Sequence, residues 1–316
     1  MAWNPIIVGV DGSPESRGAV ELAWTIAQAA RAPLVPVHAV PDLWLAGDVQ
    51  QPLVLPPDIY ETLIQASRLG IERFLDGLVP PEVRAQLEVR TGSAATAIAD
   101  VARRRRADLV VLGGKHHGAL ARSLGRSTAH YLVRAVDAPL LVTGPSPGRV
   151  ARVLVAVDLS AASLPTITGA ERFADLFGAR LRVLHVVEPL RFTFLMVDTL
   201  DDAGFERRSR AVFERLVAPL KTVAPEDRVV RTGPAADTIA DEAAAWHADL
   251  VVVGSHGKGW VDRLLVGSTT ERLLHSLPAS LLVIPSAGAR RAATPRRRPP
   301  RRRRKGPAKP RRRRRS

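Results

Sequence analysis

The chain has 316 residues, of which 46% are hydrophobic, and it contains no cysteine. At about 100–200 residues per domain, this length predicts two domains, and the hydrophobic content excludes a wholly disordered chain. The absence of cysteine excludes disulfides, thiolate metal sites and cysteine nucleophiles. The first residues lack the pattern of a signal peptide, and no stretch approaches the roughly 20 apolar residues that span a bilayer. We therefore expect a cytoplasmic protein with no membrane segment.

The net charge of +15 comes from the C-terminal end of the sequence. Residues 290–316 include sixteen Lys and Arg and no acidic residue, which leaves 30 basic against 31 acidic residues in the rest. We expect 287–316 to be a disordered Arg/Pro-rich tail. Two interpretations of this tail stay open. It binds nucleic acid nonspecifically through phosphates, or it is a merely solubilising extension.

The sequence repeats itself with a period of about 140 residues, which is the size of a whole domain. Three segments recur: 6–13 as 153–160, 91–100 as 232–241, and 107–113 as 248–254. The offset is 147 residues for the first segment and 141 for the others, so the first copy is about six residues longer, within 41–57. We expect domains at 1–145 and 150–286, joined by a short Gly/Pro linker.

Each copy alternates short β-branched runs with longer segments of helical periodicity. The expected strands are 5–10, 34–40, 87–90, 108–113 and 139–143, then 152–157, 180–187, 227–231, 249–254 and 280–284. Nearly continuous hydrophobic strands are typical of a parallel sheet covered on both faces. Ser13 and Pro14 supply an N-cap and a helix-starting proline. The pattern predicts an α/β fold of two tandem doubly wound, Rossmann-like domains, each with five strands and four helices.

In such sheets ligands bind beyond the carboxyl ends of the strands, where the strand order reverses. The loops after the first and fourth strands begin near Asp11 and Gly113 in the first copy, and near Asp158 and Gly254 in the second. Those loops are the predicted ligand-binding edge. At that edge Asp158 is placed to accept hydrogen bonds from ribose hydroxyls or a base amine.

The loop after the fourth strand of the second copy is rich in glycine, with the spacing Gly-x2-Gly-x9-Gly-Ser at Gly254, Gly257, Gly267 and Ser268. Glycines let backbone N–H groups approach a phosphate and permit positive φ. Ser268 and Thr269 precede a helical pattern, and a helix N-terminus attracts anions. Lys258 and Arg263 lie in the same loop, while neither of the common phosphate-loop motifs occurs anywhere in the chain.

With Asp158, the His185–Val186 pair on the second strand and this glycine spacing, the sequence resembles the universal stress protein family in its tandem two-domain form, over residues 3–286. The resemblance implies a strand order of 3-2-1-4-5 in each domain and an ATP or AMP site, with Mg²⁺ accompanying ATP. It also implies that the last strands of the two domains, around 140–142 and 281–283, pair as an intramolecular pseudo-dimer. Carried over by position, the nucleotide-binding residues are Asp158, Val186, Val253, Gly254, Gly257, Gly267, Ser268 and Thr269.

The first copy departs from this pattern at two glycine positions. His116 stands at the position of Gly257, where its side chain would intrude on the phosphates, and Arg126 at that of Gly267, where it must adopt the φ of the glycine. The positions that remain as weaker candidates are Asp11, Ala39, Gly113, Ser127 and Thr128. We expect the first copy to bind ATP much more weakly or not at all. The alternative is a rearranged anion site that uses Arg126 with Gly118 and Gly125.

No nucleophile, zinc-protease or paired-carboxylate motif appears, so we expect at most slow ATP hydrolysis and no other enzyme activity. His38 and His185 are predicted to be packed, hydrogen-bonded histidines, and His116–His117 to be solvated rather than metal-binding. The favoured function is a stress-response regulator with a nucleotide and an unknown regulatory protein partner. The alternatives are a nucleic-acid-associated protein that acts through the tail, and a nucleotide-independent interaction scaffold. Whether two chains form a further homodimer stays open.

Overall fold

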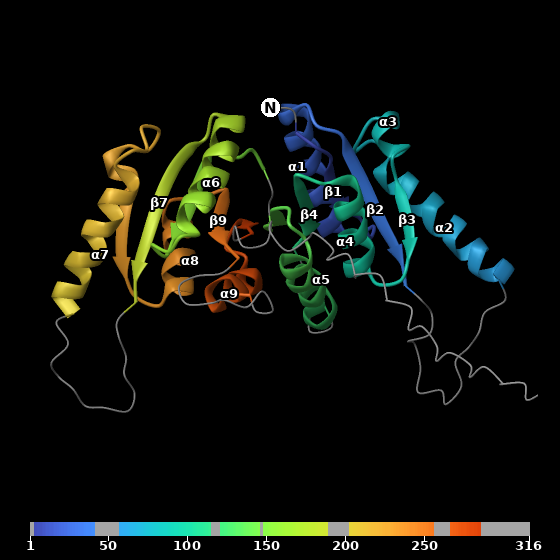
Figure 1. Ribbon diagram of the computed structural model, residues 1–316. Coiled ribbons are helices and arrows are strands. Elements are labelled where there is room, and N and C mark those ends of the chain that lie inside the picture. Colours follow the sequence, from blue (N-terminus) through green and yellow to red (C-terminus); the bar gives the residue numbers. More distant parts are fainter. Residues whose placement is uncertain are drawn as a thin grey trace, which may run out of the picture.

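The structure is a computed structural model that describes residues 3–41, 57–114, 121–145, 148–188, 202–255 and 266–285. Gly257, His116–His117 and the tail at 287–316 lie outside these residues. Ten strands form one sheet in the order β3-β2-β1-β4-β5-β10-β9-β6-β7-β8. Each half therefore has the predicted order 3-2-1-4-5, and the two halves lie side by side (Figure 1).

The observed strands match the predicted ones to within about a residue at each end. They are β1 (Ile6–Gly9), β2 (Leu34–Val40), β3 (Glu88–Thr91), β4 (Leu109–Gly113), β5 (Leu140–Thr143), β6 (Arg152–Val157), β7 (Arg180–Val187), β8 (Arg228–Thr232), β9 (Leu250–Gly254) and β10 (Ser280–Ile284). Register also matches between the repeats, since Ala39 pairs with Arg90 as Val186 pairs with Arg231. The α/β fold predicted from the alternating pattern is confirmed.

The helices follow the strands as right-handed crossovers require. They are α1 (Pro14–Ala30), α2 (Pro57–Leu75), a short α3 (Pro81–Arg84), α4 (Ala94–Arg105), α5 (Ala121–Ala135), α6 (Ser163–Phe177), α7 (Asp202–Val217), a 3-10 turn η2 (Pro225–Asp227), α8 (Ala235–Ala245) and α9 (Ser268–Ser276). Ser13 caps α1 as predicted, because its side chain accepts a hydrogen bond from the N–H of Ser16. Among the described residues, no helix combines the length and the hydrophobicity needed to cross a membrane.

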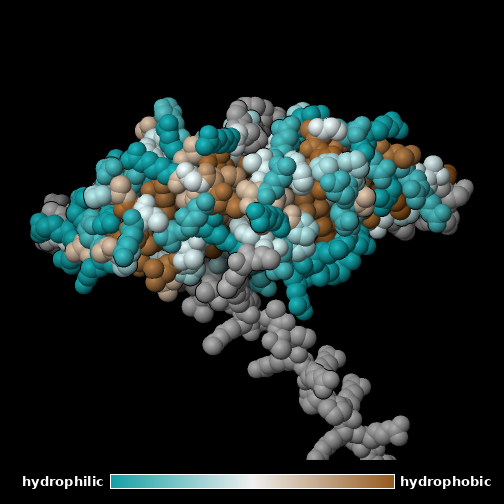
Figure 2. Space-filling view, turned by 90° about the horizontal axis from the view of Figure 1, so that it is seen from above, coloured by the Kyte–Doolittle hydropathy of each residue, from teal (hydrophilic) through white to brown (hydrophobic). Residues whose placement is uncertain are grey.

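Two hydrophobic cores lie on opposite faces of the sheet, and each core runs through both repeats. One core joins side chains of α1, α2, α6 and α7 to alternate strand residues such as Ile6, Val8, Val153 and Val155. The other joins α4, α5, α8 and α9 to the intervening strand residues. Seen from above, the surface is mostly hydrophilic, and its hydrophobic patches are interrupted by hydrophilic side chains (Figure 2).

The predicted pairing of the last strands is confirmed. Strands β5 and β10 are antiparallel, with Leu140 opposite Val283 and Val142 opposite Leu281. Beside this pair the N–H of Gly144 donates to Ser280 Oγ at 3.1 Å, and a Cβ at Gly144 would lie 2.7 Å from the backbone of Ala279. The backbones of the two repeats thus approach as closely as glycine allows.

Further contacts between the repeats lie on both sides of the sheet. The Arg172 guanidinium stacks over the Trp3 ring at 3.6 Å, and α1 packs against α6. On the opposite face α5 packs against α9, where His130 Nε2 lies 3.7 Å from Glu271 Oε1. Together with the β5–β10 pair, these contacts join the two repeats into one body.

The outer part of each repeat carries a carboxylate held by arginines. Asp227, 1% exposed, accepts hydrogen bonds from Arg180 and Arg182, and Arg182 also donates to Glu242 at 2.7 Å. In the first repeat Glu88 on β3 accepts from Arg90 and from Arg104 and Arg105 at the end of α4. Burial raises the pKa of Glu88, but the hydrogen bonds and charges of Arg90 and Arg105 outweigh it and hold that pKa below its ordinary value.

The helix ends of α1 and α6 offer a matched test of backbone strain. Both C-caps are left-handed, with Arg31 at φ 52° and Gly178 at φ 61°. A Cβ at Gly178 would meet nothing within 4 Å, so conformational preference alone separates glycine from other residues there. We expect Arg31→Gly to raise the free energy of unfolding by about 1 kcal/mol and Gly178→Ala to lower it by about as much. Urea denaturation measures both. Arg31→Ala keeps the Cβ and should bring no gain, and a gain equal to that of Arg31→Gly would contradict the strain argument.

The ion pairs of Glu88 predict a pH dependence. Because its pKa is lower in the folded state, ionised Glu88 stabilises the fold above its ordinary pKa, and this contribution is lost as the pH falls through the folded pKa. We expect Glu88→Gln to lower the free energy of unfolding by about 1–2 kcal/mol at pH 7 and by much less near pH 3. Urea denaturation at the two pH values measures the difference, with the exposed Glu61→Gln as the control. A loss that is the same at both pH values contradicts the proposed role of the charge.

Candidate functional site

A cavity of about 390 Å³ lies at the carboxyl ends of the central strands of the second repeat. Its walls come from β6, β7 and β9, from the starts of α6 and α9, and from α7 and α8. The lining residues are Ala156, Val157, Asp158, Ala162, Ser163, Thr166, His185, Val186, Val187, Glu188, Phe205, Ser209, Ala235, Ile239, Val253, Gly254, Gly267, Ser268, Thr269 and Thr270. Seven of the eight residues predicted for the second copy are among them, and Gly257 is outside the described residues.

The topology explains why these residues meet. Strand β6 pairs with β7 on one side and with β9 on the other, so the chain leaves β6 and β9 toward opposite faces of the sheet. Helices α6 and α9, which follow these strands, pack on opposite faces of the sheet, and the cavity lies between their starts. Asp158 follows β6 directly, and Gly254 ends β9. The cavity therefore lies at the edge of the sheet where the sequence predicted a ligand to bind.

The two carboxylate oxygens of Asp158 differ, because one is fixed by hydrogen bonds and the other has no hydrogen-bond partner among the described residues. Oδ1 accepts hydrogen bonds from the N–H of Ser160 at 3.0 Å and from Ser163 Oγ at 3.2 Å. Oδ2 is buried and makes no hydrogen bond within the described residues. A buried carboxylate oxygen without a donor is costly, so this atom marks a place where a ligand N–H or O–H would be favourable.

Glycine and hydroxyl residues stand where β9 ends and α9 begins. Gly267 is the N-cap of α9, and this residue has no side chain with which to cap the helix. Its first-turn N–H groups, beside Ser268 and Thr269, are suited to an anion. Gly267 has φ −59°, which any residue can adopt, so the expectation that Arg126 must take up a strained glycine conformation is wrong.

Several lining residues were not predicted from the sequence. Ser163 and Phe205 carry no motif, and Thr270 follows the predicted pair of hydroxyl residues. Glu188 accepts a hydrogen bond from the N–H of Ala235 at 2.9 Å and so caps α8, whose N-cap residue Pro234 makes no side-chain bond. A proline at the N-cap position, where Ser93 caps α4, is the sequence signal that another residue must supply the cap.

The prediction that His38 and His185 are packed, hydrogen-bonded residues is confirmed. His185 Nδ1 lies 2.8 Å from the carbonyl oxygen of Val157, and its ring stacks on Phe213. His38 Nδ1 lies at the same distance from the carbonyl of Val10. Since a carbonyl only accepts, Nδ1 carries the hydrogen in both rings. In each repeat the imidazole therefore ties the second strand to the end of the first.

The first repeat arranges its corresponding residues differently. Helix α5 begins at Ala121, so Ser127 and Thr128 lie inside the helix, whereas their counterparts Ser268 and Thr269 start α9. Amide groups inside an α-helix are bonded to its own carbonyls and are not available to an anion. Asp11 is exposed and accepts from the N–H and hydroxyl of Ser13.

The remaining first-repeat candidates are Gly113 and Ala39. A Cβ on Gly113 would lie 2.6 Å from the backbone of Glu15, so packing against α1 accounts for that glycine. Ala39 is half-buried on β2, at the position corresponding to Val186. The structure thus gives the second repeat, but not the first, a helix start at the end of its glycine loop.

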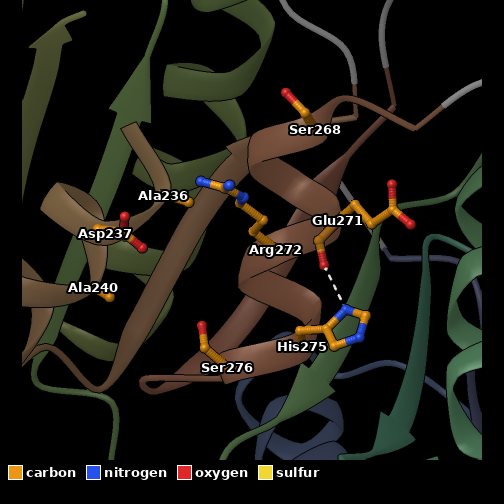
Figure 3. Close-up of a pocket in the computed structure, with 8 residues that line it drawn as sticks. All are labelled: Ala236, Asp237, Ala240, Ser268, Glu271, Arg272, His275 and Ser276. Atoms are coloured by element: carbon orange, nitrogen blue, oxygen red, sulfur yellow. Dashed lines mark hydrogen bonds between the residues drawn. The ribbon is translucent and has the colours of Figure 1, made fainter. Parts of the chain in front are cut away.

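A second groove of about 560 Å³ lies between α8 and α9 (Figure 3). It shares Ser268 with the first cavity, and the Arg272 side chain extends toward Ala236 across it. Its lining includes the acidic residues Asp237 and Glu271 together with Arg272 and His275. Within the described part of the chain, no group of three or more His, Asp or Glu could hold a metal ion.

Comparisons with known proteins agree with the fold. The model of the universal stress protein family matches residues 2–144 and again 150–285. A universal stress protein of Mycolicibacterium smegmatis is 29% identical over 298 residues, which cover 88% of this chain and 96% of that protein. One from Mycobacterium tuberculosis is 28% identical over 299 residues, with the same shares of the two chains.

Solved structures support the same architecture. The crystal structure of a universal stress protein from Archaeoglobus fulgidus superposes with a TM-score of 0.61 at 16% identity, over 90% of this chain and 96% of the other. A functionally unknown protein from Pseudomonas aeruginosa gives a TM-score of 0.58 at 19% identity, over 90% and 93%. At these identities the likeness concerns the fold alone.

Proposed function

Because the chain belongs to the universal stress protein family, with two tandem copies of its domain, we propose that it is a stress-response regulatory protein that binds ATP or AMP in its second domain. The observation that carries this proposal is the buried Oδ2 of Asp158, which has no hydrogen-bond partner among the described residues and lies in the cavity of about 390 Å³. An acceptor at that position suits the hydroxyls of a ribose or the amine of a base. A cavity of this size is in the range that small ligands use.

The chemistry of the walls divides into two parts. Val186 and Val253 with Ile239 form an apolar wall suited to a base, while Gly254, Gly267 and Ser268 lie where backbone N–H groups and a helix start suit phosphates. Since no group of metal-ligating side chains occurs among the described residues, Mg²⁺ would be brought by the phosphates of ATP. The residues present therefore fit a nucleotide.

The site supports binding better than catalysis. Asp158 is held by Ser160 and Ser163 on one carboxylate oxygen and is suited to bind the nucleoside. A regulator must pass its state to another molecule, so the proposal includes a protein partner that distinguishes the nucleotide-bound form. A nucleotide-independent scaffold is the alternative, and partner binding that is equal with and without ATP would favour it.

The proposal predicts one bound nucleotide per chain. Substituting Asp158 and its counterpart in the first repeat, Asp11, tests which repeat binds it. We expect Asp158→Ala to weaken ATP binding roughly ten- to a hundredfold, because a charge-assisted hydrogen bond is worth about 1.5–3 kcal/mol. Isothermal titration calorimetry measures the affinity and the stoichiometry. Asp11→Ala, the matched change in the first repeat, should leave both close to the wild-type values. If Asp11→Ala abolishes binding and Asp158→Ala does not, the site lies in the first repeat and the assignment fails.

We propose a second function for the basic C-terminal segment, on the observation that 290–316 contains sixteen Lys and Arg and no acid. This charge would bind nucleic acid through the phosphates without reading sequence. The rest of the chain is close to neutral and would serve as its anchor.

Replacing all sixteen basic residues by glutamine in the full chain tests this second function. We expect the affinity for a 30-base-pair DNA duplex to fall at low salt and its dependence on salt concentration to become nearly flat, since the released counterions come from those contacts. A fluorescence anisotropy salt series measures both quantities. An unchanged affinity and salt dependence would exclude the tail as the binding element, while the ATP site should be unaffected by these substitutions.

A further inference from the structure

The ends of the glycine loop in the second repeat are joined by a side chain that the nucleotide pattern does not include. The loop leaves β9 at Gly254 and returns to α9 at Ser268. Thr270, in the first turn of α9, donates from Oγ1 to the carbonyl oxygen of Gly254 at 2.8 Å. Its side chain lies in a buried position, with the residue only 3% exposed. A buried hydroxyl bond of this kind fixes the helix start relative to the strand end.

Two backbone hydrogen bonds complete the same junction. The N–H of Ser255 donates to the carbonyl of Ile284 on β10 at 2.8 Å, and the N–H of Gly267 donates to the carbonyl of Ser255 at 3.1 Å. The two ends of the loop, Ser255 and Gly267, are therefore hydrogen-bonded to each other beside the end of β10. The Thr270 side chain adds a hydrogen bond from α9 to Gly254 at the end of β9.

The first repeat has no threonine at the position of Thr270. Ala129 stands at the position of Thr270, and alanine has no hydroxyl with which to reach Gly113. In that repeat the helix begins at Ala121 instead of at the corresponding serine. The fold of the repeat is otherwise preserved, with matching strand order and register, so the threonine is not required to build the sheet.

We propose that Thr270 is a positioning residue of the nucleotide site, which holds the first-turn N–H groups of α9 at a fixed place relative to Gly254. This inference rests on the proposed nucleotide binding. The hydroxyl of Thr270 does not contact the ligand in this assignment, because it is engaged by Gly254. We expect Thr270 to affect the binding of the phosphates and not of the nucleoside. The groups that it positions are the start of α9 and the backbone at Gly254, whereas Asp158 lies on the nucleoside side of the cavity.

The experiment compares ATP with adenosine in the full chain. We expect Thr270→Val, which keeps the shape and removes the hydroxyl, to weaken ATP binding about tenfold, or roughly 1.4 kcal/mol. Adenosine, which has no phosphate, should bind to Thr270→Val and to the wild type equally. Thr270→Ser restores the donor and should recover most of the ATP affinity. Calorimetry or competition with a fluorescent nucleotide measures the ratio of the two affinities.

A matched control separates positioning from general destabilisation. Thr143 on β5 is also buried, and its Oγ1 donates to the carbonyl of Leu112 at 3.4 Å. Thr143→Val should lower the melting temperature without changing the ratio of ATP to adenosine affinity. If Thr270→Val leaves that ratio unchanged while the wild type binds ATP, the positioning role is refuted. If the wild type binds neither ligand, the proposed function fails instead.

Discussion

The antiparallel pairing of β5 with β10 is the contact on which the rest of the architecture depends. It turns two parallel five-stranded sheets into one sheet of ten strands, and it lets both hydrophobic cores continue from one repeat into the other. An unpaired hydrophobic edge strand invites association with other chains, and here each repeat covers the edge of the other. Close backbone approach at Gly144 adds to the pairing. The repeats are consequently stabilised as a pair, whatever either one binds.

This shared stability explains how two copies of one fold can differ at their ligand-binding edges. In the second repeat α6 begins two residues later than the position corresponding to Pro14, and the cavity opens beside Asp158. In the first repeat the helix after β4 starts early and runs through the residues that correspond to Gly267 and Ser268. Arginine is a much better helix former than glycine, so Arg126 favours this continuation. The change at the loop leaves the strands and the cores in place.

Hydrophobic periodicity and the internal repeat were sufficient to predict the strands and the α/β class, whereas the strand order and the pairing of the last strands followed from the resemblance to the family. The strands rest on local patterns, and the chain contains each pattern twice, once in each repeat. The sequence could also locate the site edge, because Asp158 and Gly254 both follow buried runs. It could not predict that α5 begins at Ala121, since helix starts depend on which of several competing caps is used. The carboxylates of Glu88 and Asp227 were likewise missed, because their arginine partners are brought together only by the folded sheet. Thr270 was missed for the same reason, as its bond to Gly254 crosses a loop of unrelated composition.

Helix α9 connects the candidate site to the contact between the repeats. Its first residue, Ser268, lies in the cavity, and one turn later Glu271 faces His130 on α5 across the interface. His130 and Glu271 occupy corresponding positions in the two repeats, so this contact lies on the approximate two-fold axis. A rigid helix transmits a displacement of its start along its whole length, because its turns are bonded to one another. Any ligand held at the start of α9 therefore acts on an element that also contacts the other repeat. The candidate site and the interface between the repeats are thus joined by one helix, α9.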